Sequence, residues 1–368
     1  MLPPTPIPPD WRIDWDTIDQ YPWMQALRGV SQNIDRHAEG DVWTHVHMVV
    51  EEMVAMPAWR VLPHDVRQIL FLAALFHDIA KPATFRKESD DRISFRGHSR
   101  RGSIMARNIL WRLNFPFHQR EQVCAIIRHH LVPFFLVDSD NPVQIASEIT
   151  QSVRADWLRL MAIADAKGRI CPDPLKLLDQ IEHFRQTCQQ LNCWGHARLF
   201  LNERDRFHYF NFTGKARPYP PTEPYRCEVI LLCGLPSSGK DYWVQRVAPQ
   251  KRMISLEQIR QKNRIPASDP QGKGFQLTFD AAIQCLKRGE NFIWNAPHLT
   301  RVSRAECAKV CRDHHARLRI VHIETPYQQL IHQNNQRPRP VPVHVIDRMT
   351  DRWEVPDLSE AHQVDLVI

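Results

Sequence analysis

The feature that most constrains the fold is a proline-rich break that divides this chain of 368 residues into halves of different pattern. Four prolines interrupt the segment 213–224. Proline continues neither a helix nor a central strand, so the segment predicts an extended linker. We therefore expect two domains, residues 1–212 and 227–368, joined by a linker at 213–226. This division agrees with the roughly 100–200 residues usual for one domain.

The half before the break has the pattern of an all-α domain. Residues 66–76 are apolar on nearly every side, which predicts a buried helix. No strand-like alternation of useful length appears in this half. Apolar spacing predicts an amphipathic helix at 43–53 and further helices near 99–113, 119–130, 142–149, 152–166 and 174–192.

The half after the break alternates short apolar segments with helical stretches. Residues 227–233 have the length and composition of a buried strand. Strands that alternate with helices predict an α/β domain with a parallel sheet. Similar strand-like segments recur at 252–255, 291–295, 317–323 and 363–368.

Composition narrows the class of protein and of partner. The chain is 43% hydrophobic and 24% charged, which excludes a disordered tail protein, a collagen and a disulfide knot. Its formal charge of +7 favours an anionic partner, with nucleic acid or nucleotides first. No run approaches the roughly 18 apolar residues of a membrane span, and the start is unlike a signal peptide, so we expect a cytoplasmic protein with no membrane partner. Nine cysteines without a CxxC motif predict neither a disulfide framework nor a zinc ribbon.

An adjacent His-Asp pair, His77-Asp78, ends the buried helix of the first half. Burial of an imidazole and a carboxylate is costly, and a divalent metal offsets this cost when both groups are its ligands. The pair alone is weak evidence, because His64-Asp65 also occurs at a predicted helix start, where Asp65 is better explained as a cap.

The wider pattern around the pair resembles the HD phosphohydrolase superfamily. His45 precedes the pair on an amphipathic helix, Asp165 follows at the end of a distant helix, and Lys81 lies just after the pair. The resemblance implies a helical core on which His45, His77, Asp78 and Asp165 hold one metal ion. It also implies a role for Lys81 as a fixed positive charge near a substrate phosphate.

Two further positions match members of that superfamily with two metals. His98 and the pair His129-His130 fall where those members carry additional ligands, with Asp78 as the bridge. Adjacent helical residues point about 100° apart, so only one of His129 and His130 is expected to face the site, and the sequence leaves open which. The implied cofactors are one or two divalent transition metals, namely Mn, Ni, Co or Fe.

The second half opens with a phosphate-binding loop. Residues 234–241 follow a predicted strand, precede a helical segment and match the Gly-x4-Gly-Lys pattern of a P-loop, which binds ATP together with Mg2+. Asp241 stands where Ser or Thr normally helps to hold magnesium. A carboxylate there could hold the ion directly or through water, but it also adds negative charge beside the phosphates. The residues expected to bind the nucleotide are Gly234, Pro236, Ser237, Ser238, Gly239, Lys240 and Asp241.

Two downstream segments resemble polynucleotide 5′-kinases of the phage end-repair type. Glu257 and Arg260 match an acid-x-x-Arg element in which the acid is the general base for a 5′-hydroxyl group and the arginine contacts the neighbouring phosphate, although these kinases carry Asp where this chain has Glu. Arg337 and Arg339 lie in a proline-rich segment similar to their lid. The alternatives are a surface Glu and Arg on a helix, and a plain basic surface loop.

Together the two halves resemble bifunctional bacterial nucleic-acid end-healing enzymes, in which an HD phosphohydrolase is fused to a P-loop polynucleotide kinase. The resemblance implies ATP-dependent phosphorylation of 5′-hydroxyl ends and metal-dependent removal of a 3′-phosphate or 2′,3′-cyclic phosphate. The implied partners are broken RNA or DNA ends and a ligase that acts downstream. Two alternatives remain open: a phosphohydrolase–kinase fusion that acts on free nucleotides or another small molecule, and a non-catalytic nucleotide-sensing or RNA-binding protein.

Overall fold

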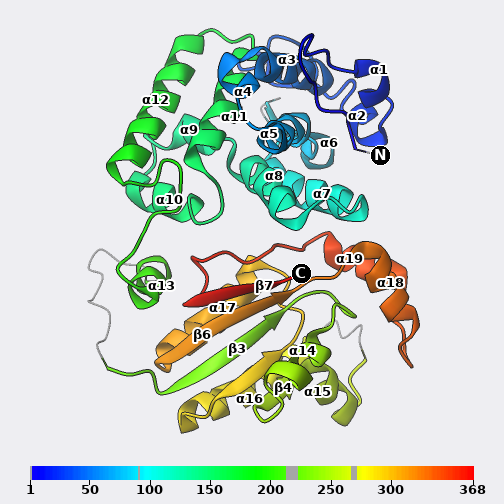
Figure 1. Cartoon of the computed structure of the whole chain (residues 1–368), viewed down its shortest axis with the longest axis vertical. Coiled ribbons are helices and arrows are strands. Elements are labelled where there is room, and N and C mark those ends of the chain that lie inside the picture. Colours follow the sequence, from blue (N-terminus) through cyan, green and yellow to red (C-terminus); the bar gives the residue numbers. More distant parts are fainter. Residues whose placement is uncertain (1, 90–91, 213–222, 267–271) are drawn as a thin grey trace. The chain divides into compact units, whose positions relative to one another are not determined.

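The computed structural model describes residues 2–89, 92–212, 223–266 and 272–368, and the chain forms two compact units, Met1–Leu199 and Phe200–Ile368 (Figure 1). The division falls at residue 199 and not at 212, the boundary that the helical pattern predicted. The reason is that helix α13 (Glu203–Asn211) packs its Phe207 into the hydrophobic core of the second unit. Of the expected linker at 213–226, residues 213–222 lie outside the described part of the chain.

The first unit is helical, apart from a short antiparallel pair of two-residue strands. This architecture confirms the predicted all-α domain. Its elements are α1 (Trp15–Ile18), α2 (Pro22–Gln25), α3 (Val42–Ala55), α4 (Pro57–Arg60), α5 (His64–Phe76), α6 (Lys81–Thr84), β1 (Arg86–Lys87), β2 (Ile93–Ser94), α7 (His98–Arg112), α8 (Phe117–His129), α9 (Val132–Phe135), α10 (Pro142–Ile149), α11 (Ala155–Lys167) and α12 (Pro174–Gln190).

Helix α5 lies in the middle of this unit. All eight residues from 69 to 76 are buried, as expected for a helix that is apolar on every side. Helices α3, α7, α8 and α11 each contribute buried apolar side chains to the same core as α5. The end of α5 is therefore enclosed by protein, and polar groups placed there are held away from water.

The second unit contains a five-stranded parallel sheet in the order β4-β5-β3-β6-β7, which confirms the predicted parallel α/β domain. Each strand falls within one residue, at either end, of the segment predicted for it. The elements after α13 are β3 (Cys227–Cys233), α14 (Lys240–Val247), β4 (Arg252–Ser255), α15 (Leu256–Lys262), α16 (Lys273–Arg288), β5 (Phe292–Asn295), α17 (Arg301–Asp313), β6 (Ala316–Ile323), α18 (Tyr327–Asn335), α19 (Val343–Thr350) and β7 (Gln363–Val367).

Alternate residues of the central strand β3 face opposite sides of the sheet. Val229 and Leu231 pack with apolar side chains of α16 and α17, whereas Ile230 and Leu232 pack with those of α14. Both faces of the sheet are thus covered, as is usual for parallel sheets. The carboxyl ends of β3, β4 and β5 then lie at one edge, where the loop after β3 can meet groups from its neighbours.

The structure also bears on membrane-spanning helices and on the cysteines. No helix in the described residues is long and apolar enough to cross a membrane. All nine cysteines are free, and eight of them are buried.

Candidate metal centre and phosphate-binding loop

The end of α5 carries His77 and Asp78 into the interior of the first unit, where both are almost fully buried. Helix α3 brings His45 to the same point, and α11 brings Asp165, both with no exposed surface. His45 Nε2 lies 3.3 Å from His77 Nε2 and 3.3 Å from Asp165 Oδ1. His77 Nε2 lies 3.2 Å from Asp78 Oδ2. The four residues of the HD-like pattern therefore converge, although they span more than 100 positions of the chain.

A second group of candidate ligands lies on the other side of Asp78. His98, at the start of α7, places Nε2 3.3 Å from Asp78 Oδ1 and 3.4 Å from His130 Nε2. His130 is buried, and burial lowers its pKa to about 3, so that its imidazole is neutral. His129, by contrast, lies 3.5 Å from Ser152 Oγ through its Nε2. The structure thus brings His130, and not His129, into the cluster.

The four clustered imidazoles share one orientation. In each, Nδ1 faces a backbone carbonyl oxygen, which accepts its proton and leaves Nε2 with an unshared electron pair. This arrangement presents four Nε2 atoms to the same small volume. The Nδ1–oxygen pairs are His45 with Gly168 (3.1 Å), His77 with Ala74, His98 with Phe95 and His130 with Ile127 (each 2.8 Å).

The side chains of this cluster make few favourable contacts with one another, but they suit a divalent cation. Nε2 atoms that face each other at 3.3–3.4 Å as electron-pair acceptors make no favourable hydrogen bond. Among the described residues, none donates a hydrogen bond to the buried Asp78 Oδ1. Imidazole and carboxylate ligands suit first-row transition metals. Three sets of side chains in the described residues are close enough to hold one ion each: His45–His77–Asp78, Asp78–His98–His130 and His37–Glu39–His45. The first two sets share Asp78.

Two cations keep the carboxylates of the cluster ionised. Burial alone would raise the pKa of Asp78, but Lys81, whose Nζ lies 2.7 Å from Asp78 Oδ2, holds that pKa well below its usual range. Burial also opposes ionisation of Asp165, yet the guanidinium of Arg169 holds its pKa well below the usual range. Arg169 donates to both carboxylate oxygens of Asp165, at 2.8 and 2.6 Å. Lys81 thus lies beside the cluster, and its ammonium group is bonded to the Asp78 carboxylate and to Gln32.

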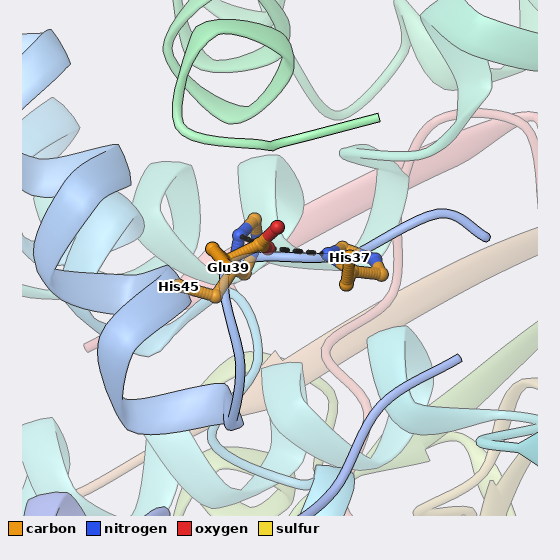
Figure 2. Close-up of side chains that lie close together, drawn as sticks. All are labelled: His37, Glu39 and His45. Carbon is orange, nitrogen blue, oxygen red and sulfur yellow. Dashed lines mark hydrogen bonds and ion pairs between the residues drawn. The ribbon is translucent and has the colours of Figure 1, made fainter. Parts of the chain in front are cut away.

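Glu39 is a residue of this site that the sequence did not indicate. Its Oε1 lies 2.9 Å from His45 Nδ1 and 2.8 Å from His37 Nδ1, so one carboxylate joins the two imidazoles (Figure 2). Its Oε2 accepts from the N–H of Ile170 (2.9 Å). Burial lowers the pKa of His45, but hydrogen bonds to Asp165 and Glu39 outweigh this and raise it. A carboxylate on the outer nitrogen of a metal-binding histidine orients the ring and increases its basicity as a ligand.

In the second unit, the loop after β3 has the backbone geometry of a phosphate-binding loop. Gly234 has φ +151°, and a Cβ at this position would lie 2.3 Å from Ile323 O, so only glycine fits. Ser237 and Gly239 also have positive φ, at 64° and 97°. Among the described residues, the buried Ser238 Oγ has no hydrogen-bond partner. The Ser238 hydroxyl is therefore available to an anion at the start of α14.

Lys240 is folded back onto its own loop. Its Nζ donates to Gly234 O (3.0 Å) and Leu235 O (2.6 Å). Burial lowers its pKa to about 8. The next residue, Asp241, accepts a hydrogen bond from Asn295 Nδ2 (2.7 Å) at the end of β5. Pro236 lies partly exposed in the same loop.

The four predicted kinase residues, Glu257, Arg260, Arg337 and Arg339, differ in their contacts. Arg337 Nη2 donates to both oxygens of Glu257, at 3.0 and 3.1 Å, and its Nη1 lies 3.5 Å from Ser237 Oγ. The lid-like segment thus meets both the candidate base and the loop. Arg260 packs beside the aromatic ring of Phe275, with 5.9 Å between its Cζ and the ring centroid. Arg339 is exposed.

Family comparisons agree with this division into units. Residues 45–164 match the HD domain family, and residues 229–356 match a family described as AAA domain. The chain therefore combines an HD domain with a P-loop domain. A solved structure of a kinase candidate from Chloroflexus aurantiacus is similar to 39% of this chain and 86% of its own, with 11% identity and a TM-score of 0.32. The strand order β4-β5-β3-β6-β7 and the backbone of the loop after β3 define the fold of the second unit.

Curated relatives match only part of the chain. A CC-adding tRNA nucleotidyltransferase of Thermus thermophilus is 33% identical over 30% of this chain and 24% of its own length. A Multifunctional CCA protein of Ralstonia nicotianae is 30% identical over 44% and 38%, respectively. An A-adding tRNA nucleotidyltransferase of Deinococcus radiodurans is 38% identical over 18% and 16%. The chain thus spans well under half the length of each of these relatives.

Proposed function

We propose that this protein heals broken nucleic-acid ends with two separate active sites. The P-loop unit would phosphorylate 5′-hydroxyl ends with ATP, and the HD unit would remove a 3′-phosphate or a 2′,3′-cyclic phosphate. The observation that carries the proposal is the occurrence, in one chain, of a six-ligand His/Asp cluster and a P-loop whose lid arginine, Arg337, contacts Glu257. The names of two relatives, the CC-adding and the A-adding tRNA nucleotidyltransferases, refer to tRNA and support a nucleic-acid substrate.

In the HD unit, the histidines and aspartates would hold one or two divalent metals (Mn, Ni, Co or Fe). Such metals, when bound, lower the pKa of a water molecule and neutralise charge on a phosphoester. Asp78 would belong to both groups of metal ligands, because its two oxygens face different histidines. Lys81 holds Asp78 ionised and adds positive charge where a phosphate would bind. Burial lowers the pKa of His98 and of His130, so protons compete less with a metal for these two imidazoles.

In the P-loop unit, Lys240 would leave the carbonyl oxygens of its loop and bind the β- and γ-phosphates of ATP. Glu257 would accept the proton of the 5′-hydroxyl group once Arg337 moves from the carboxylate to the phosphoryl group. Arg260 would contact the neighbouring phosphate of the strand, and Arg339 would close over the nucleotide with the lid. Mg2+ would accompany ATP at Asp241. The healed ends would be substrates for a ligase.

An oligonucleotide with a 5′-hydroxyl and a 3′-phosphate tests both halves at once. With ATP and a panel of divalent metals, we expect the wild type to phosphorylate the first end and dephosphorylate the second. Lys240→Ala should abolish only the 5′ reaction, and Asp78→Ala only the 3′ reaction, so each variant is the control for the other. A wild type that leaves both ends unchanged contradicts the proposal.

The same assay separates strand ends from free nucleotides, the alternative substrate class. Single-stranded oligonucleotide should inhibit turnover of mononucleotides, and added salt should weaken this inhibition, because phosphate contacts release counterions. If the oligonucleotide does not inhibit and mononucleotides are turned over rapidly, the small-molecule function is favoured. Metal and nucleotide binding without any turnover would favour a non-catalytic sensor.

A further inference from the structure

The P-loop unit carries a carboxylate and an amide in exchanged positions. In common P-loop enzymes, a neutral hydroxyl follows the loop lysine, and an aspartate at the end of a neighbouring strand supplies the negative charge; both help to hold Mg2+. Here Asp241 follows Lys240, and Asn295 ends the neighbouring strand β5. The carboxylate has moved to the helix, and the neutral group has moved to the strand.

The two side chains are in direct contact. Asn295 Nδ2 donates to Asp241 Oδ1 at 2.7 Å. Asn295 pairs in register with Leu232 of β3 on one side and with Ser255 of β4 on the other, so it lies between the strand that precedes the P-loop and the strand that precedes Glu257. Asn295 is buried, and its amide nitrogen lies 2.7 Å from Asp241 Oδ1 and 3.6 Å from Met253 Sδ, whereas Asp241 is exposed at the mouth of the loop. The contact is therefore part of the rim of the nucleotide site.

Electrostatic repulsion explains why a carboxylate at position 241 would be accompanied by an amide at position 295. A carboxylate at Asp241 together with an aspartate at 295 would place two anions in contact beside a triphosphate, which is unfavourable. An amide at 295 removes one of these charges and donates to the other carboxylate. The pair then carries a single negative charge, as the common hydroxyl–aspartate pair does. These residues therefore fit Mg2+ despite the atypical loop sequence.

We propose that Asp241 and Asn295 act as one exchanged magnesium-binding pair, in which Asp241 supplies the anionic oxygen and Asn295 positions it. This inference rests on the kinase half of the proposed function. A simpler alternative is that Asp241 only stabilises the N-terminus of α14 through its charge. The two explanations differ in what they predict when the side chains are exchanged.

A pure exchange of the two side chains tests the pair. Asp241→Asn removes the anionic oxygen, and Asn295→Asp adds a second one in contact with the first. Each single variant should weaken the affinity for Mn2+·AMP-PNP by about tenfold, as expected for directly coupled groups. The double variant Asp241→Asn/Asn295→Asp restores one carboxylate, one amide and their hydrogen bond, and should return to within about threefold of the wild type.

Binding is measured by calorimetry and by electron paramagnetic resonance of Mn2+, and 5′-phosphorylation is measured in parallel. Asp280→Asn is the matched control, because Asp280 accepts from Gln276 in a similar but exposed amide–carboxylate pair on α16 (3.0 Å) and should bind as the wild type does. Circular dichroism verifies folding, and Asp241→Ser/Asn295→Asp, which recreates the common arrangement, provides a second double variant.

The proposal is overturned if Asp241→Asn binds Mn2+·AMP-PNP as tightly as the wild type, or if both folded double variants bind no better than the weaker single variant. A double variant that fails to fold also counts against an interchangeable pair. If the wild type binds Mn2+·AMP-PNP but phosphorylates no 5′-hydroxyl end, the kinase function is wrong, and the binding data still decide the role of the pair.

Discussion

Replacement of Glu39 by glutamine tests whether this carboxylate supports His45 as a metal ligand. The change removes the negative charge but keeps the size and shape of the side chain. Glu39 now accepts from His45 Nδ1 and His37 Nδ1 through one oxygen and from the N–H of Ile170 through the other. A glutamine has one acceptor oxygen, so at least one of these contacts is lost. The ring of His45 would then be less basic and less firmly oriented.

The structure sets the expected size of the effect. Loss of a carboxylate behind a metal-binding histidine costs about 10- to 100-fold in metal affinity. In this protein, Gly168 O also lies 3.1 Å from His45 Nδ1 and still accepts its proton in the variant. The tautomer of His45 is therefore kept, and we expect the lower end of the range. This corresponds to about tenfold weaker binding, or roughly 1.4 kcal/mol.

The assay is the affinity for Mn2+, measured by calorimetry on protein freed of metal by chelation, together with the metal content after dialysis. Glu182→Gln provides the control, because it makes the same chemical change at a residue far along the chain. Glu182 pairs with Arg185 on the surface of α12. Circular dichroism shows whether each variant is folded. Unchanged Mn2+ affinity in folded Glu39→Gln, or an equal loss in Glu182→Gln, would refute the role assigned to Glu39.

Three further predictions follow from the described geometry. His130→Ala should reduce metal-dependent 3′-end hydrolysis by about 100-fold or more, whereas His129→Ala should stay within a few-fold of wild type, and equal losses would contradict the choice of His130. Lys240 has a pKa of about 8, which phosphate binding should raise, so ATP affinity should fall by up to about tenfold per pH unit above pH 8. Calorimetry in two buffers should detect proton uptake at pH 9, and its absence would argue against this lysine. Gly234→Ala should lower the free energy of unfolding of its unit by about 2–3 kcal/mol in urea titrations and abolish ATP binding, since the new Cβ would meet Ile323 O, and a stable variant that binds ATP would disprove the close approach.

The sequence by itself predicted the strands of the second unit, the main helices of the first unit, and many residues of the two candidate sites. Periodicity placed the strands of the second unit within one residue, because short apolar runs between helical segments have few other packed arrangements. The P-loop was evident for a related reason: its glycines and lysine are local requirements of one turn. Residues such as His77 and Asp78 were identifiable because their order along the chain follows a known pattern.

Tertiary structure decided everything that depends on which side of an element faces the site. His130 and not His129 joins the cluster, since neighbours on a helix point about 100° apart and packing of α8 selects one of them. Packing likewise assigned α13 to the second unit, despite a helical pattern continuous with the first. The contacts of Glu39 with His45 and of Asn295 with Asp241 join residues whose spacing carries no signal. Such contacts arise only when separate elements are brought together by the core, so no local pattern in the sequence encodes them.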